Sequence, residues 1–270
     1  MSTEVISCTA IVMATGAANI CRDGSKTRCA ILLGNMGLFR VYPIPAHYKF
    51  KVWSEVEVTL NRPRTDNRSE SWNLVDWKVT GTLEDPALRR AIYDRCTLDS
   101  GTLDPLTYQN KNFKSICIVK PIQMGSGIEP REARIPDENE SRGHTQADSP
   151  IKPYIKWTSI QGSVHNSHIS ANEAYETHRK NPTEPYQLFH NMKIHSPDWD
   201  FWLVMGNLKD KRNVWCIVHV GRLQKTSGTS TPLFIDLTLG KPAAWPYELQ
   251  GGGNQPVKDN QLMMSEMLCV

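Results

Sequence analysis

Basic and aromatic residues alternate between Arg40 and Trp53, a pattern suited to contact with nucleic acid. Arg40, Tyr42, Lys49, Lys51 and Trp53 all fall in this segment. Guanidinium and ammonium groups pair with phosphates, and aromatic rings stack on unpaired bases at about 1–3 kcal/mol per base. The alternative interpretation is an amphipathic strand whose basic face meets only water.

Two further groups of cations extend this pattern. Arg62, Arg64 and Arg68 lie in the loop-like segment "RPRTDNRSESW", where guanidinium groups can each donate two hydrogen bonds to a phosphate. The expected tip of a β-hairpin carries Lys209, Lys211 and Arg212. We predict that both groups belong to a nucleic-acid-binding surface. Solvated charged loops are the alternative.

A different chemistry is suggested by His165 and His168, whose spacing could ligate a metal ion from a turn or helix start. Glu173 and Asp198 could add carboxylates, which gives the alternative of a metal-dependent nuclease or other hydrolase. Histidines three residues apart are more often ordinary surface residues, and the H-E-x-x-H signature is absent. No metal and no other cofactor is therefore expected.

Several catalytic motifs are absent from the sequence. It contains neither the G-x-S-x-G elbow nor the phosphate-binding G-x-x-x-x-G-K-[ST] loop. The seven cysteines are scattered without a C-x-x-C pair, which excludes a zinc finger and is typical of free thiols in a reducing compartment. No enzymatic activity is predicted, and no catalytic residue is assigned.

The distribution of charge is more informative than its total. The 270-residue chain has a formal net charge of only +3. Between Arg22 and Arg68, however, nine Lys or Arg residues stand against four acidic ones. The N-terminus lacks a basic leader with a long apolar core, and no apolar run is long enough to span a bilayer. We expect a cytoplasmic protein without membrane contact.

The predicted elements are mostly strands. Segments rich in β-branched and aromatic residues predict strands at 5–15, 28–34, 38–44, 55–60, 73–83, 113–124 and 153–161. Asp85 and Pro86 predict the start of a helix that ends at Cys96. A second helix is expected within 169–181, capped by Ser170 or Asn172, and residues 200–221 form the clearest hairpin.

These elements predict a mainly β fold with some α structure, built as two small OB-like β-barrel domains. Residues 125–150 are polar and interrupted by Gly and Pro, so they are expected to form a flexible linker. The predicted organisation is an OB-like barrel at 1–124, this linker, a β-rich domain with a helix and hairpin at 151–224, and a flexible tail at 225–270.

The run Arg40-Val41-Tyr42-Pro43-Ile44-Pro45, followed by "YKFKVW" and "DNRSESW", resembles a little-characterised prokaryotic family. Members carry "WIRLYPVPFR", "FKKY" and "DPRPESY" in the same order. The similarity extends over residues 6 to 222, although Leu38 and Phe39 replace the family's Trp-Ile and "PAHYKF" lacks its arginine. The resemblance implies a dual-OB-domain protein encoded near mobile-element and phage-defence genes.

The predicted function is a nucleic-acid-binding accessory protein of a prokaryotic multi-protein system. DNA or RNA is the expected partner, together with protein components of a larger complex. Two alternatives stay open: the metal-dependent hydrolase, and an assembly adaptor whose basic patch and tail dock other proteins.

Overall fold

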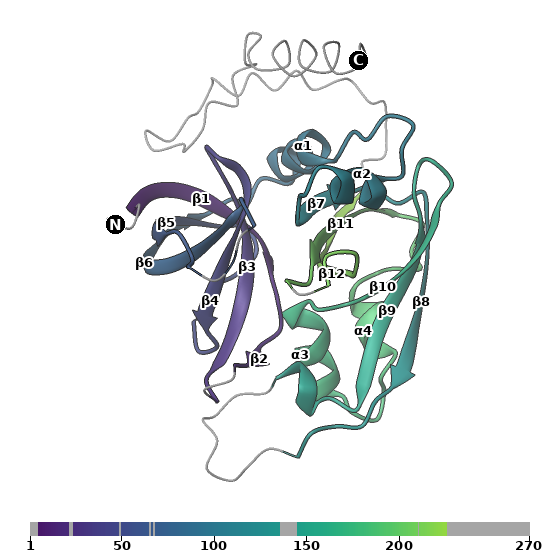
Figure 1. The fold of residues 1–270 in the computed structure, drawn as a ribbon. Coiled ribbons are helices and arrows are strands. Elements are labelled where there is room, and N and C mark those ends of the chain that lie inside the picture. The colour runs from purple at the N-terminus through teal and green to yellow at the C-terminus, as the bar shows by residue number, and fades with distance from the viewer. Residues whose placement is uncertain are drawn as a thin grey trace, which may run out of the picture. The chain divides into compact units, whose positions relative to one another are not determined.

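The first six strands form one sheet that closes into a barrel (Figure 1). The computed structural model describes residues 5–21, 24–48, 50–64, 66, 68–135, 145–209 and 211–225. The strands of this sheet are β1 (Val5–Thr15), β2 (Asn19–Ile20), β3 (Lys26–Gly34), β4 (Gly37–Pro45), β5 (Ser54–Asn61) and β6 (Ser71–Thr82). The order β1-β5-β6-β4-β3 is closed by direct pairing of β3 with β1, while β2 pairs only with β3.

The barrel has the architecture of an OB fold. β4 and β6 run parallel, and the other barrel pairings are antiparallel. A closed five-stranded barrel in which only the third and fifth strands pair in parallel has the Greek-key arrangement of OB folds. The barrel predicted for the N-terminal region is therefore confirmed. In chain order, β1, β3, β4, β5 and β6 correspond to the first to fifth OB strands.

Residue alternation explains why these segments form the barrel. In β5, Val56, Val58 and Leu60 are buried, whereas Glu57 between them is exposed. Successive side chains of a strand point to opposite faces, so this pattern gives one apolar and one polar face. Phe39 and Val41 of β4 lie in the same core, as their positions in the sequence predict.

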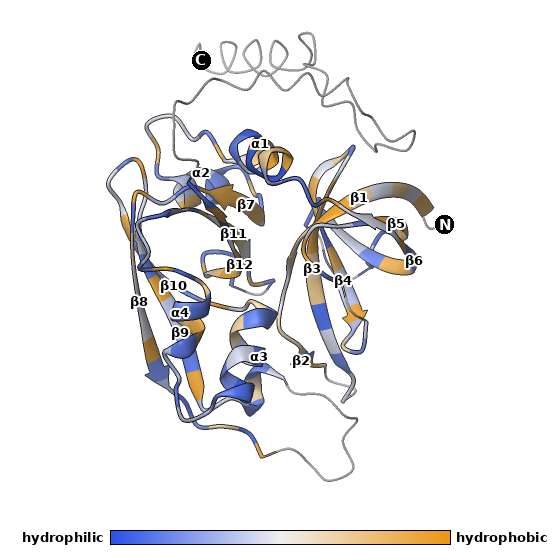
Figure 2. Cartoon of the chain, turned by 180° about the vertical axis from the view of Figure 1, so that it is seen from behind, coloured by the Kyte–Doolittle hydropathy of each residue, from blue (hydrophilic) through white to orange (hydrophobic). Residues whose placement is uncertain are grey.

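The remaining strands form two three-stranded sheets with order β10-β9-β8 and β12-β11-β7. They are β7 (Ile116–Val119), β8 (Gln123–Pro130), β9 (Ile151–Thr158), β10 (Val164–His168), β11 (Trp199–Asn207) and β12 (Trp215–Gln224). The helices are α1 (Pro86–Cys96), α2 (Pro105–Lys111), the 3-10 helix η1 (Gln146–Asp148), α3 (Asn172–Lys180) and α4 (Gln187–Asn191). Figure 2 shows hydrophobic residues along β7 and mostly hydrophilic ones on α3.

The predicted linker does not begin at residue 125. Gly125–Pro130 belongs to β8 and pairs with β9, and the ring of Tyr154 lies directly over Gly127, where a side chain would collide with it. The glycine that indicated a loop instead permits this close approach. Residues 136–144, and the predicted tail beyond Lys225, lie outside the described residues.

The second OB-like barrel and the two-domain arrangement are not confirmed. β7 lies within the predicted first domain, but it pairs with β11 and places Cys117 and Val119 in the core of the C-terminal strands. Residues Met1–Ser227 form one compact unit. A short apolar segment such as β7 does not reveal from its sequence which sheet it will join.

The sequence predicts the start of α1 correctly but not the cap of α3. Asp85 caps α1, since its carboxylate accepts a hydrogen bond from the Ala87 N–H at 2.8 Å. The cap of α3 is Ala171, without a side-chain hydrogen bond, so the predicted caps at Ser170 and Asn172 are wrong. The Ser170 carbonyl instead accepts a hydrogen bond from the Ala17 N–H, and the Ser170 N–H donates to the Ile217 carbonyl of β12. These two bonds hold Ser170 outside the helix. No helix in the described parts of the chain is long and apolar enough to cross a membrane.

Candidate nucleic-acid interface

A pocket of about 470 Å³ opens on the β3–β4 face of the barrel, and we call it the barrel pocket. In OB folds, the second and third strands and the loops after the first and fourth strands bind oligonucleotides and oligosaccharides. The barrel pocket lies at this position. It is lined by Gly16, Ala17 and Asn19 after β1, Cys29, Arg40, Tyr42 and Pro43 of β3 and β4, Pro63, Asp66 and Arg68 before β6, Asn73 of β6, Gln146, Ser170, Gly206–Lys209, and Cys216 and Val218 of β12.

Arg40 is a buried member of this lining. Its side chain lies opposite the core residues of β4, as alternation predicts, but the residue is only 5% exposed. Its Nη2 donates a hydrogen bond to the Ser115 carbonyl at 2.9 Å. Burial, together with the positive charge of Arg68, lowers the pKa of Arg40 to about 10. Alternation with the inward-facing Phe39 and Val41 predicts that Arg40 faces outward to solvent. This prediction is wrong, because Ser115 and the end of β11 pack over Arg40.

Arg68 is also buried, but it is neutralised by a neighbouring acid. Its guanidinium contacts both carboxylate oxygens of Asp66, and its Nη1 donates to the Asn207 carbonyl at 3.2 Å. Burial alone would raise the pKa of Asp66, yet the hydrogen bonds from Arg68 outweigh it and lower that pKa to about 2. Arg68 therefore fastens the β5–β6 loop to the end of β11.

Tyr42 and Lys209 stand at the rim of the barrel pocket. The Tyr42 side chain is partly exposed, and its hydroxyl lies 3.3 Å from both Cys21 Sγ and Thr27 Oγ1. Lys209 is exposed just after β11. The fold thus brings together one aromatic ring and two cations from positions 40, 42 and 209.

The other predicted cations flank the pocket or lie elsewhere. Arg62 and Arg64 are exposed on the β5–β6 loop, with the Arg62 guanidinium 3.7 Å from the centre of the Trp72 ring. Near the hairpin tip, Lys211 is exposed and Arg212 half-buried. Both segments contribute a neighbouring residue to the pocket lining, Pro63 between Arg62 and Arg64 and Lys209 ahead of Lys211.

Trp53 and Lys51 do not line the barrel pocket. Trp53 is a core residue, 8% exposed, and packs edge-to-face on Tyr93 with ring centres 4.9 Å apart. The prediction that it stacks on bases is therefore wrong. Lys51 is exposed outside the pocket lining, and Lys49 lies outside the described residues.

The predicted histidine pair is not assembled. His165 and His168 belong to strand β10 rather than to a turn or helix start, and positions three apart on a strand face opposite sides. His165 Nε2 lies 2.7 Å from Asp104 Oδ2, and its ring stacks on Trp157. His168 lies 3.9 Å from Glu129.

The two acidic residues considered for the metal site, Glu173 and Asp198, do not join the histidines. Glu173 lies 3.2 Å from His219 and 3.7 Å from Arg222, while Asp198 is exposed ahead of β11. Among residues with described positions, no group of three His, Cys, Asp or Glu side chains could hold a metal ion. The geometry therefore gives no support to the metal-dependent hydrolase.

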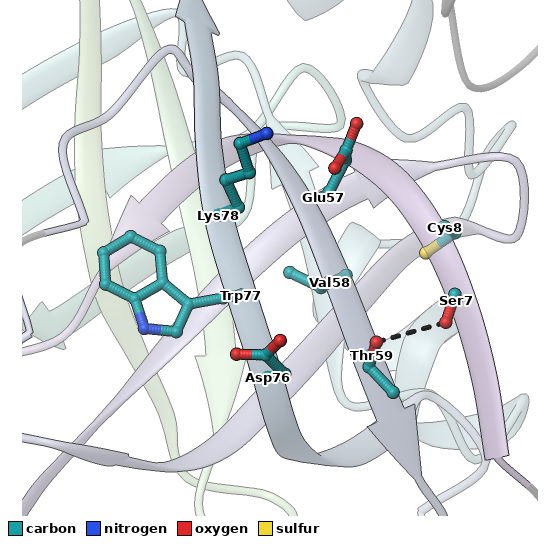
Figure 3. A pocket seen from close by; sticks show the side chains of 8 residues that line it. All are labelled: Ser7, Cys8, Glu57, Val58, Thr59, Asp76, Trp77 and Lys78. Atoms are coloured by element: carbon teal, nitrogen blue, oxygen red, sulfur yellow. Dashed lines mark hydrogen bonds between the residues drawn. The ribbon is translucent and has the colours of Figure 1, made fainter.

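A second hollow, of about 410 Å³, lies on β1, β5 and β6 (Figure 3). Its charged lining is Glu57, Asp76 and Lys78, an excess of negative charge that disfavours phosphate. Burial raises the pKa of the Cys8 thiol beside them, which disfavours the reactive thiolate. This hollow therefore suits neither nucleic acid nor nucleophilic catalysis.

No protein-family model and no curated protein matches the sequence. Solved structures with some similarity include p202 HIN1 in complex with a 12-mer double-stranded DNA, at a TM-score of 0.31 and 10% identity over 83% of this chain and 96% of that chain. A murine DNA-binding protein bound to double-stranded DNA gives a TM-score of 0.28 at 10% identity, over 83% and 98% of the two chains. At these TM-scores the similarity carries no argument about function.

Proposed function

We propose that this protein binds single-stranded nucleic acid through the barrel pocket and the basic loops beside it. The observation that carries the proposal is the grouping of Arg40, Tyr42 and Lys209 around a pocket on the ligand-binding face of an OB barrel. A cation paired with phosphate next to an aromatic ring available for stacking is the combination used by single-strand binders.

The exposed cations on either side give the strand a path beyond the pocket. Arg62 and Arg64 lie on the β5–β6 loop, and Lys211 follows Lys209 on the hairpin. Solvent-exposed cations of this kind contact phosphates without selecting a sequence. The proposed interface therefore combines one partly enclosed nucleotide site with open phosphate contacts.

Binding of a fluorescent single-stranded oligonucleotide at low salt tests this proposal. We expect Lys209→Glu to weaken binding by about tenfold or more and to flatten the salt dependence, because a phosphate contact becomes a repulsion. Lys51→Glu is the matched control, since it makes the same charge change at an exposed lysine outside the pocket lining. Absence of wild-type binding, or equal losses in both variants, would contradict the proposal.

The wider role that we propose is that of an accessory component in a prokaryotic multi-protein system linked to defence or mobile elements. The family resemblance of the Arg40–Pro45 segment supports it. Purification from the native host, with and without nuclease treatment, distinguishes proteins that bind this chain directly from proteins held to it through nucleic acid. Proteins that remain after nuclease treatment would favour the assembly adaptor over recruitment through nucleic acid.

A further inference from the structure

We infer that the barrel pocket binds a terminal nucleotide bearing a phosphomonoester, from a strand end or a free mononucleotide, in preference to the interior of a strand. This inference rests on the proposed function and specifies what its central site selects. It follows from the charge at the floor of the pocket and from the way the pocket is closed.

The floor of the pocket contains a buried cation without an acidic partner. Within the described part of the chain, no carboxylate lies at ion-pair distance from Arg40. The two nearby acids are engaged elsewhere, Asp66 with Arg68 and Glu70 with the Ser115 N–H. A buried charge without a counterion is unfavourable, so an anion entering the pocket would relieve that cost.

Arg40 retains donors for such an anion. One guanidinium nitrogen is used by the Ser115 carbonyl. The remaining nitrogens make no hydrogen bond to the described residues, and Arg40 lines the barrel pocket. A phosphomonoester carries a charge of about −1.5 to −2 near neutral pH, whereas each diester phosphate carries a single charge. The monoester therefore compensates Arg40 better.

The end of β11 closes the pocket against a continuous strand. Arg68 holds the Asn207 carbonyl, and a Cβ atom placed on Gly206 would lie only 3.0 Å from Arg40 Nη2. β11 is thus packed onto Arg40 with no space for a nucleic-acid backbone between them. A strand cannot pass across this part of the β3–β4 face, but one end of it can enter from the rim.

The size and the rim of the pocket agree with a single nucleotide. Its volume of about 470 Å³ falls within the range of roughly 300–1,000 Å³ that is typical of small-ligand sites. Tyr42 offers a partly exposed ring at the rim, where a base can stack once its phosphate reaches Arg40. The rest of the strand would leave along Arg62 and Arg64.

Strands with and without ends provide the test. The affinities of the wild-type protein are compared for a linear single-stranded oligonucleotide with a 5′-phosphate, with a 3′-phosphate or with neither, and for a covalently closed circle of the same sequence. We expect one phosphorylated linear form to bind at least about tenfold tighter than the circle, the effect of one charge-assisted contact. Mononucleotides with the corresponding phosphate should compete for binding, and the nucleoside should not.

Two variants connect the preference to the pocket. Arg40→Met should abolish the preference, so that the phosphorylated strand and the circle bind with equal affinity. Gly206→Ala, which crowds Arg40 without removing it, should lower the same preference, while Lys51→Glu should retain it. The strand comparison on wild-type protein stands even if a variant fails to fold.

The possible outcomes separate the two proposals. Equal binding of circle and phosphorylated linear strand would overturn end recognition and leave single-strand binding intact. A free mononucleotide that competes while strand ends show no preference would support phosphomonoester binding in the pocket and identify the free mononucleotide, not the strand end, as its source. Failure of every nucleic acid to bind would overturn the proposed function itself.

Discussion

Arg68 and Asp66 form a buried ion pair whose loss should be costly. Their side chains are 6% and 11% exposed, so Asp66→Asn leaves a guanidinium buried without a counter-charge. We expect the free energy of unfolding to fall by about 3 kcal/mol in chemical denaturation. Glu176→Gln, which breaks the exposed pair with Arg179, is the control and should cost less than about 1 kcal/mol.

The same pair should give a defined pH dependence. Asp66 has a pKa lowered to about 2 in the folded protein, against about 3.9 for an unperturbed aspartate. A lowered folded-state pKa contributes stability that is present above the unfolded-state pKa and is lost as pH falls. The stability difference between wild type and Asp66→Asn should therefore shrink between about pH 4 and pH 2. A difference that stayed constant over this range would argue against the ion pair.

For single residues, the sequence predicts which side of a strand a side chain lies on, but not which distant segment covers it. Alternation places Arg40 opposite Phe39 and Val41, and the structure agrees. It does not reveal that Ser115, distant in sequence, covers that side, nor that Trp53 packs on Tyr93. Burial by a remote segment is a tertiary property, so a local pattern cannot distinguish a solvated arginine from a covered one.

Among the elements, strand β8 offers a sharp comparison between two glycines. Gly127 lies beneath the ring of Tyr154, whereas a Cβ atom on Gly125 would meet nothing within 4 Å. Gly127→Ala should lower the free energy of unfolding by about 1–3 kcal/mol, because the ring and strand must shift. Gly125→Ala, two residues away on the same strand, should be nearly neutral. Two neutral substitutions would instead support the flexible segment predicted from residue 125.

Periodicity explains which elements were predicted and which were missed. β5 alternates apolar and polar residues, and the helix at Pro86–Cys96 begins after a capping aspartate, so the sequence predicts both elements. β8 contains Gly125 and Gly127 and has no alternating pattern, and therefore resembled a loop. The hairpin of β11 and β12 was evident, but not that its turn would close the barrel pocket.

For the molecule as a whole, we expect residues 1–227 to unfold in one cooperative transition. Arg40 and Arg68 of the barrel region donate to the Ser115 and Asn207 carbonyls, so separating the barrel from the later strands would break both hydrogen bonds together. Hydrogen exchange at increasing denaturant should give one common free energy for the protected amides of β3–β5 and of β11–β12. Asp66→Asn should lower both values equally, because a change in one cooperative unit is felt throughout it. Exchange that opened the barrel and the later strands at different free energies would favour the two independent domains expected from sequence, and the barrel pocket would then be a contact that opens before either part unfolds.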